Sequence, residues 1–162
     1  MLDLIAMYEA QKAFRNRIDY KGNDRFGELI LALQVELGEC ANELPESFKF
    51  WAHKENNLQD ALIEYADGLH FILDIGHEIF FEDFDMIYLL SGEDKGRPLA
   101  TQFRYIFALV SKLDKTKSSI TFIELLSEYI GLGEMIGFSF EQIEEAFYVK
   151  DSINHQRQDN QY

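Results

Sequence analysis

The sequence predicts an all-α protein, a bundle of five or six helices. Apolar residues recur at steps of three and four along most of the chain, which is the period of an amphipathic helix. Only 2 prolines and 10 glycines interrupt the 162 residues, and 47% of all residues are apolar. This balance is typical of long helices that pack on one another. We see no run that alternates apolar and polar residues in the manner of a strand.

The first three helices are expected to begin and end at recognisable capping signals. The first spans about residues 2–18, and a Lys-Gly-Asn-Asp break follows it, which ends in a capping residue, Asp24. The second runs over about residues 24–44 and stops at Pro45, because proline cannot continue a helix. Asn57 is a plausible N-terminal cap for a third helix over about residues 58–79.

The middle of the chain is harder to assign. The apolar run at residues 80–90 either extends the third helix or forms a short separate one. A loop at residues 91–98 then precedes a helix over about residues 99–115.

Two capping boxes predict the last two helices. Thr121 with Glu124 opens a helix over 121–136, and Ser139 with Gln142 opens a helix over 139–155. The tail from about residue 156 has no apolar periodicity, so we expect it to be mobile without a ligand.

Size, charge and cysteine content limit the possible partners. At 162 residues the chain is expected to form one domain, residues 1–162. A net charge of −14 would repel a polynucleotide. Cys40 is the only cysteine, which favours the reducing cytoplasm. We also expect no membrane partner and no export, because no apolar run is bilayer-long and the N-terminus lacks a basic leader.

Two pairs of carboxylates share one internal spacing. Glu36 and Glu39 lie three residues apart, as do Glu64 and Asp67, so each pair occupies one face of a helix. If the second helix folds back antiparallel to the first, both pairs face one cavity. The alternative is a solvated acidic face, but these acids lie beside apolar stripes, where carboxylates need partners. Hard oxygen ligands select hard cations, and therefore predict Mg²⁺ or Mn²⁺.

An aromatic segment stands between the two acidic pairs. Phe48, Lys49 and Trp51 belong to the sequence FKFW. They offer aromatic faces on which a nucleobase can stack and a cation for a phosphate. A loop that plugs the bundle with aromatic side chains is the alternative.

A histidine follows the second acidic pair on the same helical face. His70 lies three residues past Asp67, with Phe71 beside it, and it is able to donate to a ligand carbonyl. A hydrogen-bonded core histidine is the competing interpretation. Gln11 on the first helix is a further candidate for ligand contact, against the alternative of an exposed glutamine.

The last helix carries a stripe of hydrogen-bond donors. Lys150, Asn154 and Arg157 are spaced four and three apart, so they share one face. An arginine fork and a lysine ammonium both suit phosphate. A basic helix end favoured by the helix dipole is the alternative.

These segments together resemble a known family. The carrying segments are VELGECANE at 35–43, FKFW at 48–51, EYADGLHF at 64–71 and the C-terminal stretch 137–162. The sequence resembles the dimeric, all-α dUTP diphosphatases, which are related to the wider all-α NTP pyrophosphohydrolases that include the MazG-like proteins. The resemblance runs in register from about Gln11 to the end of the chain.

The resemblance implies a homodimer that hydrolyses dUTP, and also dUDP, to dUMP with Mg²⁺. It also implies roles for individual residues. The metal ligands would be Glu36, Glu39, Glu64 and Asp67, with Glu36 also orienting or deprotonating the attacking water. The nucleotide would be bound by Gln11, Phe48, Lys49, Trp51, His70, Phe71, Lys150, Asn154 and Arg157. Lys49 and the C-terminal donors would serve mainly its phosphates.

Three other functions remain open on the sequence. The same fold could hydrolyse another triphosphate such as dCTP. A ferritin-like di-metal protein is a second alternative, although neither acidic pair has the histidine of its usual Glu-x-x-His motif. A non-catalytic helical interaction protein that uses residues 80–90 as its surface is the third.

Overall fold

The computed structural model describes residues 2–82 and 96–160, and its described part is helical with no strand. The α-helices are α1 (Leu4–Arg15), α2 (Arg25–Asn42), α3 (Leu58–Glu78), α5 (Leu99–Thr116), α6 (Ser119–Ile136) and α7 (Phe140–Asp159), and the short 3₁₀ helix η1 covers Pro45–Ser47. The all-α prediction is confirmed. Most of the apolar run at 80–90 and of the loop at 91–98 lies outside the described residues.

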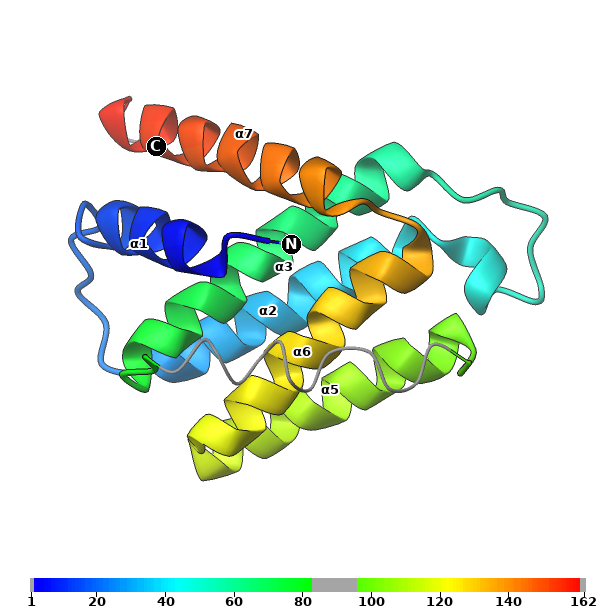
Figure 1. Ribbon diagram of the computed structural model, residues 1–162, viewed down its shortest axis with the longest axis horizontal. Coiled ribbons are helices and arrows are strands. Elements are labelled where there is room, and N and C mark those ends of the chain that lie inside the picture. Colours follow the sequence, from blue (N-terminus) through cyan, green and yellow to red (C-terminus); the bar gives the residue numbers. More distant parts are fainter. Residues whose placement is uncertain (1, 83–95, 161–162) are drawn as a thin grey trace.

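The helices form three layers (Figure 1). The antiparallel pair α2 and α3 makes the central layer. Helices α1 and α7 pack on α3 on one side, while α5 and α6 pack against α2 and α3 on the other. The two helices that carry the acidic pairs are therefore neighbours, and α7 packs on α3.

Most predicted caps are present. The side chains of Asp24 and Asn57 each accept from the backbone N–H three residues further on, at 3.0 and 3.2 Å. These bonds satisfy N–H groups that the first turn of a helix leaves unpaired. Ser139 and Gln142 form a complete capping box, with bonds of 3.2 and 2.8 Å. The predicted starts of α2, α3 and α7 are confirmed.

The capping box predicted for α6 is wrong. The helix begins at Ser119, and Thr121 is a buried residue inside it. The Glu124 carboxylate instead accepts a hydrogen bond from the Tyr105 hydroxyl on α5. Glu124, which the local pattern suggested for a cap, thus serves the packing between α5 and α6, while Thr121 is buried.

Helix α7 continues to Asp159, past the predicted end at residue 155. Arg17, in the connection between α1 and α2, contacts this last turn. Its guanidinium lies 2.6 Å from Nδ1 of His155 and forms an ion pair with Asp159. These contacts join segments that are far apart in the sequence, so helical periodicity gave no sign of them.

A pair of buried tyrosines ties α3 to α6 beneath the acidic residues. The Tyr65 hydroxyl donates to the Tyr129 carbonyl at 3.0 Å, and the Tyr129 hydroxyl donates to the Tyr65 carbonyl at 2.8 Å. The rings stack with centroids 4.6 Å apart. Gly68 makes the room, because a Cβ there would lie 2.2 Å from the Tyr129 hydroxyl oxygen. These contacts fix the turn of α3 that carries Glu64 and Asp67 against α6.

None of the helices within residues 2–82 and 96–160 combines the length and the apolar character that crossing a membrane requires.

Candidate active site

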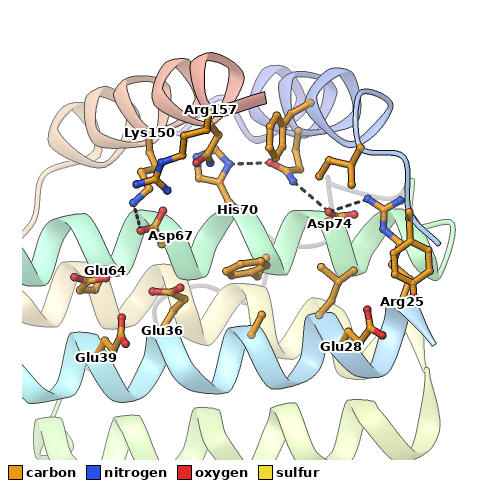
Figure 2. A pocket seen from close by; sticks show the side chains of 18 residues that line it. Arg25, Glu28, Glu36, Glu39, Glu64, Asp67, His70, Asp74, Lys150 and Arg157 are labelled. Carbon is orange, nitrogen blue, oxygen red and sulfur yellow. Dashed lines mark hydrogen bonds and ion pairs between the residues drawn. The ribbon is translucent and has the colours of Figure 1, made fainter. Parts of the chain in front are cut away.

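A cavity of about 570 Å³ opens between α1, α2, α3 and α7. Figure 2 shows acidic side chains from the central layer on one side and Lys150 and Arg157 of α7 on the other. Ten residues that the sequence singled out line it: Gln11, Glu36, Glu39, Glu64, Asp67, His70, Phe71, Lys150, Asn154 and Arg157.

Three carboxylates converge at one end of this cavity. Glu36 of α2 and Glu64 and Asp67 of α3 each place one oxygen within 4.8 Å of the others. Oε2 of Glu36 is buried and has no hydrogen-bond partner among the described residues. Glu39 lines the same cavity but is exposed and lies outside this trio (Figure 2).

The pKa values of the trio reflect burial and mutual repulsion. Burial, followed by the charges of Asp67, Glu39 and Glu64, raises the pKa of Glu36 to about 7. The pKa of Glu64 is raised by burial and by Asp67. Burial also raises the pKa of Asp67, although Lys150 opposes this effect. A positive charge between these groups would relieve the repulsion.

The trio fits a hard divalent cation. Its donors are all carboxylate oxygens, the ligand type that Mg²⁺ and Mn²⁺ prefer. The buried oxygen of Glu36 also lacks the partner that a buried polar atom normally has. Glu36, Glu64 and Asp67 are the residues best placed to hold such an ion, and Glu39 lies next to them.

Helix α7 supplies positive charge opposite the acids. The Lys150 ammonium forms an ion pair with Oδ2 of Asp67. Asn154 and Arg157 line the cavity one and two turns further along, and the charge of Arg157 opposes the rise in the pKa of Asp67 that burial causes. The cavity therefore has acids on one wall and anion-binding donors on the facing wall.

A buried hydrogen-bonded chain also lines the cavity, next to the acids along α3. Nδ1 of His70 lies 2.8 Å from Oε1 of Gln11, and Nε2 lies 3.1 Å from the Phe147 carbonyl oxygen. Nε2 of Gln11 donates to Asp74 at 3.3 Å. Burial lowers the pKa of His70 to about 4, so the ring is neutral at pH 7. Gln11 is only 3% exposed, which excludes the exposed glutamine considered above.

The FKFW segment does not reach the cavity. Phe48, Lys49 and Trp51 follow η1, and none of them lines the cavity. Lys49 bonds Asn42, and Trp51 is 66% exposed. The segment does not plug the bundle with aromatic side chains either, because the side chain of Phe50 is 94% exposed to solvent. The contact of these residues with a nucleotide stays a prediction.

Several residues that line the cavity were not predicted from the sequence, and the most important of them is Asp74. This residue lies on α3, seven residues past Asp67 and four past His70, and is buried. The signal was present, because residues at these spacings share one helical face and Asp74 stands between apolar Leu73 and Ile75. Other lining residues that were missed are Phe14, Ile18, Tyr20, Arg25, Glu28, Leu29 and Ala32.

Fold and site together define a helical protein in which a carboxylate cluster that fits a cation faces lysine and arginine side chains across a cavity. A comparison with protein families agrees with this class. The family model described as dUTPase matches residues 3–162, so the chain belongs to the dUTPase family, the enzymes that hydrolyse dUTP. A search of the curated proteins found no match.

Proposed function

We propose that this cavity is the dUTP site, and that the carboxylates bind Mg²⁺, or Mn²⁺ in its place, while dUTP or dUDP is hydrolysed to dUMP. The observation that carries the proposal is the buried, unpartnered oxygen of Glu36 within the trio of acids. Because substrates of the dUTPase family carry a chain of phosphates, a cation held by these acids would neutralise part of the substrate's charge.

The reaction adds water to a phosphoanhydride bond. With dUTP the products are dUMP and pyrophosphate, and with dUDP they are dUMP and phosphate. Mg²⁺, when bound, supplies positive charge to the phosphate oxygens. Glu36 orients the attacking water and accepts its proton. Glu39, Glu64 and Asp67 complete the acidic wall that holds the cation.

The donors of α7 bind the phosphates in this proposal. With a cation bound by the acids, the Lys150 ammonium, which now pairs with Asp67, would be free to contact a phosphate oxygen. Arg157 offers a planar fork and Asn154 an amide on the same face. Charge that builds on the phosphates during hydrolysis is stabilised by donors that are already in position.

The nucleoside occupies the end of the cavity near His70, Phe71 and Gln11. His70 and Gln11 provide polar atoms for the base, while Phe71 provides an apolar wall. Phe48, Lys49 and Trp51 close over the nucleotide by a movement of their loop, since they lie outside the cavity now. Their exposed aromatic faces support a stacking role.

We also propose a homodimer that works in the cytoplasm. Leu31 and Val35 lie one turn apart on α2 and are 61% and 47% exposed. Such an apolar surface is what a second copy would cover. The single, buried Cys40 suits a reducing compartment.

A substrate panel tests the proposed function. The protein is given dUTP, dUDP, dCTP, dTTP and UTP at fixed Mg²⁺, and monophosphate formation is followed by chromatography. We expect dUTP and dUDP to be converted to dUMP and the others to react at least about a hundredfold more slowly. Preferential turnover of dCTP would assign the site to the related triphosphate hydrolase instead.

A further inference from the structure

The C-terminal half of α7 has little apolar packing to hold it. The buried side chains of this helix, Ile143 and Phe147, both lie in its first half. Beyond Phe147 no side chain of α7 is buried, although this part carries Asn154 and Arg157 of the cavity wall. A helix end without such packing tends to fray, because most helical stability comes from tertiary contacts. Polar contacts must therefore hold these turns in place.

Arg17 makes such contacts with the last turn of α7. It lies in the connection after α1, where its backbone N–H donates to the Phe14 carbonyl at 2.9 Å. Its Nη1 lies 2.6 Å from Nδ1 of His155 and 3.3 Å from the His155 carbonyl oxygen, and its guanidinium pairs with Asp159. The Phe14 ring packs edge-on against the His155 ring, with centroids 5.3 Å apart. The end of α1 is thus joined to the end of α7, which lies beside it (Figure 1).

The contact with Arg17 determines which nitrogen of His155 carries hydrogen. A guanidinium only donates, so Nδ1 must be an unprotonated acceptor. The hydrogen of the neutral ring is then on Nε2, which lies 3.7 Å from Oδ1 of Asp151. That oxygen is buried and accepts no hydrogen bond from the described residues. The ring therefore presents an acceptor to Arg17 and its hydrogen toward an acid, and an apolar side chain could do neither.

We propose that Arg17 is a positioning residue for phosphate binding. By holding His155 and Asp159, it keeps the last two turns of α7 in place. Asn154 and Arg157 alternate with these two residues along the same turns, so fraying there would remove both donors from the cavity wall. This inference rests on the proposed function, because it assumes that the donors of α7 bind phosphates.

Loss of the Arg17 contacts should weaken nucleotide binding without slowing the chemical step. If these turns are ordered in only a fraction of the free protein, the apparent affinity falls in proportion to that fraction. The bound nucleotide orders the turns again, so the complex reacts as before. The expected signature is a higher KM with an unchanged kcat.

Arg17→Met removes the guanidinium and keeps much of the apolar stem. We expect KM for dUTP to rise by about fivefold or more, with kcat within about twofold of wild type. Arg104→Met is the matched control, because Arg104 is an exposed arginine on α5, on the other side of the central layer. Its KM should match wild type. An unchanged KM in Arg17→Met, or a loss confined to kcat, would overturn the proposal.

Two variants of His155 separate its acceptor from its bulk. Asparagine places an amide oxygen where Nδ1 lies, whereas leucine has no acceptor there. We expect His155→Leu to raise KM for dUTP as Arg17→Met does, and His155→Asn to keep most of the affinity. Equal KM values in the two variants would show that Arg17 does not act through this nitrogen, and would contradict the proposal.

Hydrogen exchange tests the same contacts without turnover. The backbone amides of residues 155–159 report fraying of this turn in the nucleotide-free protein. Exchange should be about fivefold faster or more in Arg17→Met than in wild type, and unchanged in Arg104→Met. Equal exchange in Arg17→Met and wild type would overturn the inference. Failure of the wild-type protein to hydrolyse dUTP would instead refute the proposed function.

Discussion

Glu36 combines half-burial, three acidic neighbours and an oxygen without a hydrogen-bond partner among the described residues. Glu36→Gln keeps the size of the side chain but removes its charge and its basicity. We expect kcat for dUTP to fall on the order of 10³-fold, with the fold intact by circular dichroism. Glu145→Gln, an exposed position on α7, is the control and should retain activity. A Glu36→Gln protein with full activity would refute the assignment of the cluster.

The raised pKa of Glu36 also predicts how metal binding depends on pH. A cation needs the carboxylate form, and the pKa of Glu36 is about 7 in its absence. Below pH 7 binding must therefore displace a proton, while at pH 8 it does not. The apparent affinity for Mg²⁺ should fall by about tenfold per pH unit below 7.

Calorimetric titration with Mg²⁺ at pH 6 and pH 8 measures this effect, and buffers of different ionisation enthalpy count the released protons. Affinity that is the same at both pH values would mean that Glu36 does not bind the ion.

At the level of single residues, the sequence could predict the carboxylates and the α7 donors, because helical spacing alone places them on common faces. It could not predict that Gln11 would be buried against Asp74, since that contact joins residues 63 positions apart. The sequence also could not place Phe48 and Trp51 relative to the cavity. These residues lie in a loop, and without a helical repeat the sequence does not show which way their side chains point.

The tyrosine pair makes the joint between α3 and α6 sensitive to small changes. Tyr129→Phe removes one buried hydrogen bond and should lower the free energy of unfolding by about 1 kcal/mol. Gly68→Ala places a methyl group against the Tyr129 hydroxyl and should cost about 1–3 kcal/mol.

Urea unfolding of both variants measures these losses. Gly131→Ala is the control, because a Cβ at this helical position meets nothing within 4 Å. A Gly68→Ala protein as stable as wild type would show that the two helices are not packed as described.

Helix α7 contributes binding energy for the phosphates. Lys150→Met removes the ammonium opposite the acids, and we expect KM for dUTP to rise by about tenfold or more, because hydrogen bonds to charged groups are strong. Steady-state kinetics measures this, with Lys115→Met at the exposed end of α5 as control. An unchanged KM would show that Lys150 serves only as the partner of Asp67.

The start of a helix could be predicted where the residues that form its cap lie close together in the sequence. Asp24, Asn57 and Ser139 cap the helices that they were expected to cap, because each cap is complete within four residues. Thr121 was misleading because its helix starts earlier and packs against α5. The last turn of α7 was missed because Arg17 contacts it from the other end of the chain.

For the molecule as a whole, the exposed apolar pair on α2 predicts self-association. Sedimentation equilibrium should give a mass of about twice the 18.9 kDa of one chain. Leu31→Glu should shift the protein toward monomer, whereas Ile120→Glu, at another exposed apolar position, should not. A wild-type monomer at micromolar concentration would contradict the dimer.

At this scale the all-α class followed from composition and periodicity, whereas the family was implied by a resemblance in four short segments, and the family match over residues 3–162 agrees with it. The layered arrangement that closes the cavity did not follow, because the order in which helices pack is decided by contacts between distant segments. The position of α7 across α3 is the main example, since it turns two separate motifs into facing walls.

The central claim is that the carboxylate cluster holds a divalent cation which dUTP hydrolysis requires. The most direct measurement is the initial rate of dUMP formation from dUTP in metal-free buffer as Mg²⁺ is added. We predict a rate near zero without the ion and a saturable rise with it, absent in Glu36→Gln. Rapid hydrolysis in the presence of a chelator would contradict the account.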